Sequence, residues 1–123
     1  MAQFHEDLKS KIDEYIHLIY RITKSFPKDE LYGATSQIRR ATLSVMLNYI
    51  EGFARGRDKV QLNFLEISYG SLQESKYLLD FSKEEKYINE NDYKKAITLA
   101  EDVGAMLWGI MRNLRNNNNS KKI

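Results

Sequence analysis

Apolar residues recur at every third or fourth position through most of the chain, which is the repeat of an amphipathic α-helix. The repeat is clearest near the N-terminus, in the series Leu8, Ile12, Tyr15, Ile19, Ile22 and Phe26. A second series, near the C-terminus, comprises Tyr93, Ile97, Ala100, Gly104, Leu107, Met111 and Leu114. No stretch shows the strict alternation of apolar and polar residues that is typical of a β-strand. The pattern therefore predicts an all-α protein.

Turn-forming residues divide the chain into four helical segments. Pro27 ends the first segment, because the residue before a proline is biased away from the helical conformation. The sequence RGRDK predicts a tight turn between the second and third segments. The expected helices span about 4–26, 36–55, 58–81 and 92–114.

Four helices of this length with short links predict a single domain, 1–115, folded as an antiparallel up-down-up-down four-helix bundle. The asparagine-rich residues that follow, 116–123, are expected to form a disordered polar tail.

A row of polar residues follows one face of the second expected helix. Its members are Arg40, Ser44, Asn48, Glu51 and Arg55, spaced so that they align at each helical turn. If the second and third helices pair in antiparallel fashion around Arg57, Arg40 lies opposite Glu74 and Ser44 lies opposite Gly70.

This pairing predicts a structural polar seam between the second and third helices. Its expected members are Arg40, Ser44, Asn48, Glu51, Gly70, Ser71 and Glu74. We expect an ion pair between Arg40 and Glu74, and a second between Glu51 and Arg55 one turn apart. An exposed binding stripe is the alternative, and a catalytic row is a more distant one.

The apolar residues of the second helix cover an arc of about 200°, more than one bundle contact needs. In the third helix, one row is expected to face the bundle: Val60, Phe64, Ile67, Ser71, Glu74, Leu78 and Phe81. A second row, Leu65, Leu72 and Leu79, would then remain for another subunit. The surplus predicts a closed cyclic homo-oligomer, with tighter packing inside a monomer as the alternative.

Composition and charge restrict the function classes. The chain has 123 residues, no cysteine and a net charge of +2, so disulfides and thiolate metal sites are excluded and a strongly basic histone-like protein is not indicated. Basic residues nevertheless concentrate in two regions, and the candidates for nucleic-acid binding are Arg39, Arg55, Arg57, Lys59, Arg112, Arg115, Lys121 and Lys122. No signal peptide or apolar span of about 18 residues is recognisable, so a cytoplasmic location is expected.

No constellation of catalytic residues is recognisable. His5 and His17 differ by about 120° around the first helix, so they do not form a metal-binding face. No phosphate-binding loop, nucleophile elbow or zinc-protease motif is present. We expect no enzyme activity, no cofactor and no metal, and we expect Trp108 to pack in the core or at a subunit boundary.

Two stretches, QIRRATLSVMLNYIEGFARG and FLEISYGSLQES, resemble the four-helix bundle proteins encoded in intervening sequences of 23S ribosomal RNA genes, some of which are called S23-type. The shared elements are N-x-x-E-G and G-S-x-x-E, at Asn48, Glu51, Gly52, Gly70, Ser71 and Glu74. The resemblance implies a homopentamer. It also implies similarity to the accessory variability protein of diversity-generating retroelements, a pentamer that binds nucleic acid and a reverse transcriptase. It implies no catalytic mechanism.

Together these features favour a non-enzymatic oligomer that binds RNA by contacting phosphates through basic side chains. The alternative is an oligomeric scaffold that docks a partner enzyme, such as a polymerase, without binding RNA directly. A ribonuclease is the third and least supported possibility.

Overall fold

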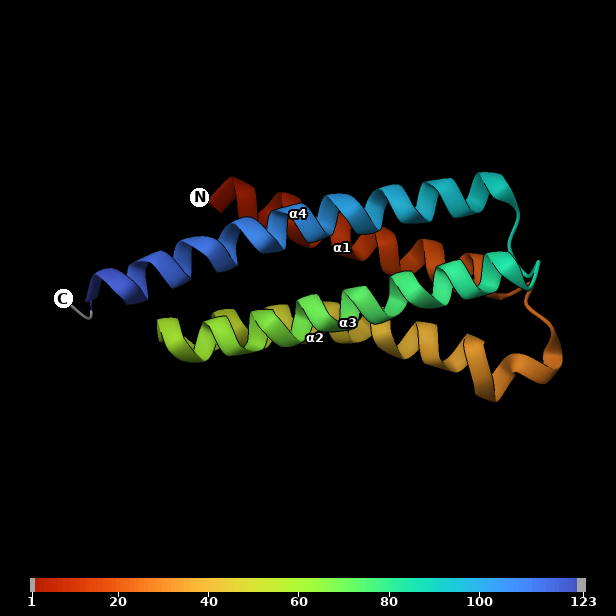
Figure 1. Cartoon of the computed structure of the whole chain (residues 1–123), viewed down its shortest axis with the longest axis horizontal. Helices are drawn as coiled ribbons and strands as arrows, with labels where there is room; N and C mark the ends of the chain where they lie inside the picture. The colour runs from red at the N-terminus through yellow and green to blue at the C-terminus, as the bar shows by residue number, and fades with distance from the viewer. Residues whose placement is uncertain (1, 122–123) are drawn as a thin grey trace.

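The computed structural model describes residues 2–121, with side chains through Asn117. Its four helices are α1 (Ala2–Thr23), α2 (Ser36–Arg55), α3 (Asp58–Glu84) and α4 (Glu90–Lys121). The connection between α1 and α2 holds a short 3-10 turn, η1 (Lys28–Glu30), and a π-helical turn, η2 (Leu31–Thr35). The described residues contain no β-strand, so the predicted all-α, up-down-up-down four-helix bundle is confirmed (Figure 1).

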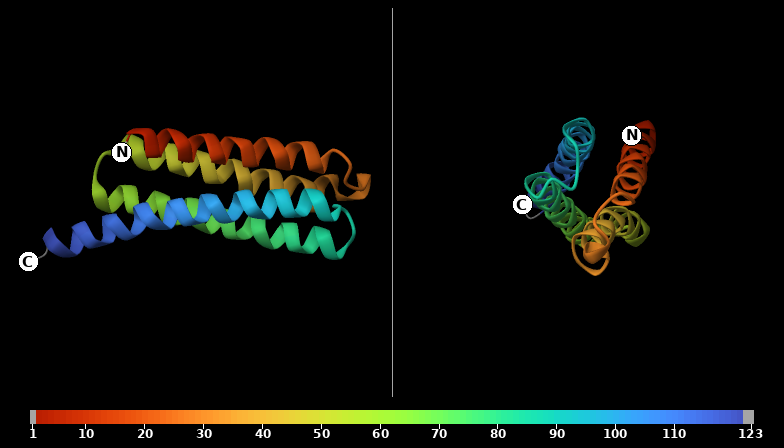
Figure 2. Two further views of the ribbon diagram at one scale, coloured as in Figure 1. Left: turned by 90° about the horizontal axis from the view of Figure 1, so that it is seen from above. Right: turned by 90° about the vertical axis from the view of Figure 1, so that its right-hand side faces the viewer.

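The helices follow one another around the bundle in chain order. Each packs against its neighbour in the chain, and α4 closes the arrangement by packing against α1 (Figure 2). The N-terminus, the α2–α3 turn and the C-terminal part of α4 lie at one end, and the other two connections lie at the opposite end (Figure 1). The last turns of α4 extend beyond the α2–α3 turn. None of the helices within residues 2–121 combines the length and apolar character that a membrane span requires.

Local hydrogen bonds explain where α3 ends and α4 begins. The amide of Tyr87 donates to the Ser82 carbonyl and that of Lys86 to the Lys83 carbonyl, while Lys86 has φ of 64°. This is a Schellman ending, and it lets α3 continue to Glu84 rather than stop near 81. The side-chain oxygen of Asn89 accepts a hydrogen bond from the amide of Asp92 at 2.8 Å, so α4 begins two residues before the expected position.

Two other boundaries also differ from the expected ones. α1 ends at Thr23. Between it and Pro27, each backbone amide donates to the carbonyl three residues earlier, as in a 3-10 turn. The segment expected to be a disordered tail continues α4 through Lys121, while residues 122–123 lie outside the described part. Extending an existing helix adds one backbone hydrogen bond per residue and needs no new nucleus, which allows even asparagine-rich residues to continue it.

The buried core confirms the apolar series of the first helix and corrects that of the third. All six members of the N-terminal series are buried. In α3, however, the core row is Leu65, Leu72 and Leu79, each fully buried, interleaved with buried Ser68, Ser75 and Ser82. Ile67 and Glu74, which were assigned to the core face, are exposed. The small serines let α2 and α3 approach closely, as the 2.7 Å hydrogen bond from the Ser68 hydroxyl to the Val45 carbonyl shows.

Candidate nucleic-acid interface

The polar seam forms at the centre of the α2–α3 contact. The hydroxyls of Ser44 and Ser71 are 2.8 Å apart. Within α2, the side-chain amide of Asn48 donates to both the hydroxyl and the carbonyl oxygen of Ser44 at 2.9 Å. The Ser44–Ser71 contact, one residue from the expected Ser44–Gly70 pairing, supports the antiparallel arrangement predicted from a turn centred on Arg57. These hydrogen bonds give Ser44 and Ser71 partners where the two helices cover them, which is a structural role.

The two outer parts of the seam behave differently. The Arg55 guanidinium donates to the Glu51 carboxylate at 2.6–2.8 Å, which confirms the expected pair one turn apart. Arg40 and Glu74 are both exposed, and within the described part of the chain no ion pair joins them, so that expected pair is wrong. Both side chains line an open groove, where water solvates them and a surface ion pair contributes little.

Close approach of α2 and α3 depends on Gly52 rather than on Gly70. A Cβ on Gly52 would lie 3.3 Å from the backbone oxygen of Gln61 and 3.3 Å from the Phe64 Cβ. A Cβ on Gly70 would meet nothing within 4 Å. Gly52, near the α2–α3 turn, is therefore the glycine that the contact between these helices requires.

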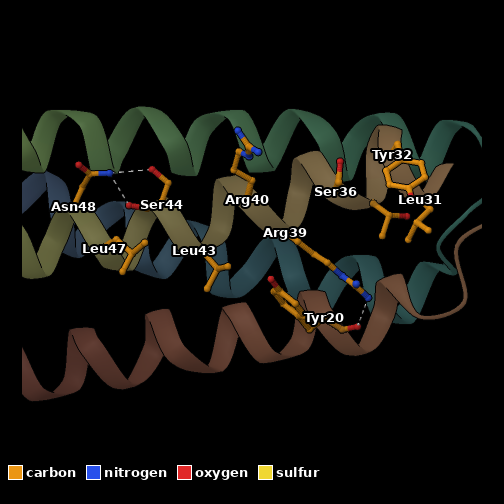
Figure 3. A pocket seen from close by; sticks show the side chains of 11 residues that line it. Tyr20, Leu31, Tyr32, Ser36, Arg39, Arg40, Leu43, Ser44, Leu47 and Asn48 are labelled. Atoms are coloured by element: carbon orange, nitrogen blue, oxygen red, sulfur yellow. Dashed lines mark hydrogen bonds between the residues drawn. The ribbon is translucent and has the colours of Figure 1, made fainter.

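Arg39 has a structural role within the bundle. Its Nε donates to the Thr23 hydroxyl at 2.8 Å, its terminal nitrogen donates to the Tyr20 carbonyl at 3.4 Å, and its guanidinium lies 4.7 Å from the centre of the Tyr20 ring. Figure 3 shows Arg39 reaching across to α1, whereas Arg40 points the opposite way. Arg39 thus joins the start of α2 to the end of α1, and its assignment as a phosphate contact stays a prediction.

We expect Arg39→Met to lower the free energy of unfolding by about 1–3 kcal/mol, because it removes charge-assisted hydrogen bonds from a half-buried site. Chemical denaturation followed by circular dichroism measures the change. Arg40→Met is the matched control, and since Arg40 is exposed its effect should stay within about 0.5 kcal/mol. Equal losses in the two variants would contradict the anchoring role.

Four of the candidate basic residues belong to elements at one end of the bundle: Arg57 and Lys59 to the α2–α3 turn and the start of α3, and Arg112 and Arg115 to the C-terminal part of α4. The α2–α3 turn and this part of α4 lie at the same end (Figure 1). Gly56, with φ of 74°, ends α2 and turns the chain there. Arg57, Lys59 and Arg112 are exposed, and Lys59 and Arg112 have no ion pair among the described residues. We name this surface, Arg57, Lys59 and Arg112, the basic end.

The remaining basic candidates either pair with an acidic residue or have side chains outside the described part of the structure. Arg115 donates to the Glu66 carboxylate at 3.0 Å and its guanidinium lies 5.2 Å from the centre of the Trp108 ring. Arg55 is engaged by Glu51, as described above. Lys121 is the last residue of α4, and its side chain is not described. Lys122 lies outside the described residues.

An apolar surface runs along α2 outside the bundle. Leu43, Leu47 and Ile50 are exposed, Leu47 by 63%, and they continue towards Leu31 and Tyr32, the latter 91% exposed. A groove of about 620 Å³ runs along the outer face of η2 and α2, and Tyr20 is its lining residue from α1 (Figure 3). The prediction that α2 keeps apolar surface beyond its bundle contacts is confirmed. We name Leu31, Tyr32, Leu43, Leu47 and Ile50 the α2 apolar face.

Trp108 does not lie in the core. Its side chain is 47% exposed on α4, beside Tyr69 at a ring-centre distance of 5.7 Å. A position at a subunit boundary stays a prediction.

The titratable side chains are dispersed. The His5 ring nitrogen lies 2.7 Å from the Tyr49 hydroxyl, and burial raises the pKa of Tyr49 to about 12. A hydrogen bond to the Asp80 carboxylate raises the pKa of Tyr93 to about 12 at the other side of the molecule. His17 lies 3.4 Å from Asp13 on an exposed face of α1. In the described part of the chain, no three His, Asp or Glu side chains come together as a metal site.

Comparisons with known proteins identify relatives of this fold. The family model described as 23S rRNA-intervening sequence protein matches residues 7–109. A crystal structure from Bacteroides thetaiotaomicron, of a protein with unknown function from the S23 ribosomal protein family, superposes with a TM-score of 0.76 at 20% identity. The alignment covers 85% of this chain and 97% of that one. A search of curated proteins gave no match.

Proposed function

The chain belongs to the 23S rRNA-intervening sequence protein family, and from this premise we propose that it is a non-enzymatic, oligomeric protein of the cytoplasm that binds RNA through its phosphates. The observation that carries the proposal is the basic end. Its three side chains are exposed, and Lys59 and Arg112 have no acidic partner among the described residues. A cation that is free of acidic partners can neutralise a phosphate and release the condensed counterion, which drives RNA binding at low salt.

Oligomerisation strengthens this activity in the proposal. One basic end offers only a few phosphate contacts, which give weak binding at physiological salt. A closed cyclic homo-oligomer, a pentamer as the family resemblance implies, repeats the basic end and converts weak contacts into avidity. The α2 apolar face is the surface that supports such assembly, since exposed contiguous apolar side chains mark interaction sites.

Binding of labelled single-stranded fragments of ribosomal RNA, measured by fluorescence anisotropy between ~50 and ~300 mM salt, tests the proposal. The triple variant Arg57→Gln, Lys59→Gln, Arg112→Gln should weaken binding roughly 10- to 100-fold at ~0.1 M salt and lower the salt slope by about 2. The control, Lys9→Gln, Lys28→Gln, Lys86→Gln, removes the same charge from exposed positions elsewhere and should leave the slope nearly unchanged.

The second candidate function is a scaffold that docks a partner enzyme without binding RNA directly. The observation that favours it is the 620 Å³ groove along the α2 apolar face, because contiguous exposed apolar surface marks protein interaction sites. Absence of RNA binding at the lowest salt, by a folded protein of established mass, would overturn the RNA proposal and favour the scaffold.

A further inference from the structure

A second cationic surface lies in the groove between α1 and α4, at residues that the sequence analysis does not single out as a site. The face of α1 at this groove carries Glu14, His17, Leu18 and Arg21, and the facing turns of α4 carry Lys94, Lys95, Thr98 and Leu99. The groove has a volume of about 810 Å³. Because α1 and α4 run antiparallel, the late turns of α1 meet the early turns of α4 there, far from the basic end (Figure 2).

The charge of this groove is positive once its local ion pairs are counted. Lys11 of α1 is neutralised by Asp102 of α4 at 3.7 Å, and this pair joins the helices next to the groove. Arg21, Lys94 and Lys95 remain at the rim, all exposed, against a single lining acid, Glu14. Lys94 and Lys95 have no ion pair among the described residues.

We propose that this α1–α4 groove binds a single strand of RNA, with phosphates on Arg21, Lys94 and Lys95 and bases against Leu18 and Leu99. The proposal rests on the RNA-binding function proposed above and adds a second contact surface to it. The half-buried leucines offer apolar area to unstacked bases, while the long basic side chains at the rim can follow a flexible backbone.

The lining of the groove favours a single strand over a duplex. Its apolar side chains, Leu18 and Leu99, can be covered only by bases that are unstacked and unpaired. A duplex is much broader and keeps its bases stacked inside, so it would touch the rim and leave the leucines uncovered. The groove therefore discriminates between the two forms, whereas the basic end, with its exposed cations, attracts both.

The test compares two triple variants on two ligands. The groove variant is Arg21→Gln, Lys94→Gln, Lys95→Gln, and the basic-end variant and the Lys9, Lys28, Lys86 control are those described above. Each is measured against a labelled 20-nucleotide polyuridine strand and against an RNA duplex of equal length, with folding checked by circular dichroism and mass by light scattering. We expect the groove variant to lose roughly 10- to 100-fold in affinity for the single strand at ~0.1 M salt and less than about 3-fold for the duplex.

Each contrary outcome overturns the groove assignment in a recognisable way. If the groove variant keeps full affinity for the single strand and the basic-end variant loses it, the groove is not an RNA-binding site, while the proposed RNA-binding function is supported. Equal losses on both ligands indicate general electrostatic attraction. A changed mass of the groove variant indicates a contact between copies of the chain. If the unsubstituted protein binds no RNA, both the proposed RNA-binding function and the proposed groove site are refuted.

Discussion

Leu72→Ala is expected to lower the free energy of unfolding by about 2–5 kcal/mol. Leu72 is fully buried on α3, and its Cδ2 lies 3.3 Å from the place that a Cβ on Gly104 would occupy. The leucine therefore fills the space that glycine leaves on α4, and truncation opens a cavity between two helices. Urea denaturation followed by circular dichroism, at equal protein concentrations, measures the loss.

Ile67→Ala is the matched control on the same helix. Ile67 is 48% exposed, so its truncation should change the stability of the bundle by less than about 1 kcal/mol. The comparison discriminates between the two possible core rows of α3, because the row expected from the sequence contains Ile67 and the row in the structure contains Leu72. A larger loss from Ile67→Ala would mean that the core row has been assigned to the wrong face.

The buried residues of α1 and α3 show why the apolar periodicity predicts the core face of α1 correctly and that of α3 wrongly. In α1 a single heptad-like seam is apolar, so its buried face follows directly from the spacing. α3 carries large apolar residues on several faces, and its true core face alternates leucine with serine at Ser68, Ser75 and Ser82. Serine lowers the apparent hydrophobicity of that face, although a buried serine can return its hydroxyl to a backbone carbonyl, as Ser75 does to Leu72 at 2.7 Å.

In the candidate site, contacts within one helix or within the α2–α3 hairpin could be predicted, and contacts that involve α1 or α4 could not. The Glu51–Arg55 pair depends only on spacing along one helix, and it was predicted. The choice between neighbouring Arg39 and Arg40 depends on where α1 packs, which no local pattern contains. Arg21 and Lys94 belong to the first and last helices, so the α1–α4 groove becomes visible only when those helices are placed side by side.

The start of α4 is a boundary whose signal was present and was misread. Asn89 and Asp92 both suit a cap, and they are spaced as the two ends of a capping box. In the structure Asn89 is the cap and Asp92 lies at the third helical position, with the side-chain amide of Asn89 donating to the Asp92 carboxylate at 3.2 Å. When two capping residues lie three positions apart, the first of them, here Asn89, is expected to be the N-cap.

The double variant Leu43→Asp, Leu47→Asp is expected to convert the proposed oligomer into a folded monomer. Both leucines are exposed in the isolated chain, so aspartates there are solvated and the bundle keeps its stability. At a subunit contact the same aspartates would be buried without partners, which costs several kcal/mol and weakens association by at least about 100-fold. Light scattering coupled to size exclusion, over a range of protein concentrations, measures the mass.

The control for added charge is Asn63→Asp, Gln73→Glu, which places two carboxylates on exposed positions of α3, away from the α2 apolar face. Its mass should equal that of the unsubstituted protein. The monomeric double variant should also lose RNA affinity, since each molecule then presents one basic end instead of several. A monomeric unsubstituted protein at micromolar concentration would refute the cyclic oligomer. An unchanged mass in the double variant would show that the chains assemble through another surface.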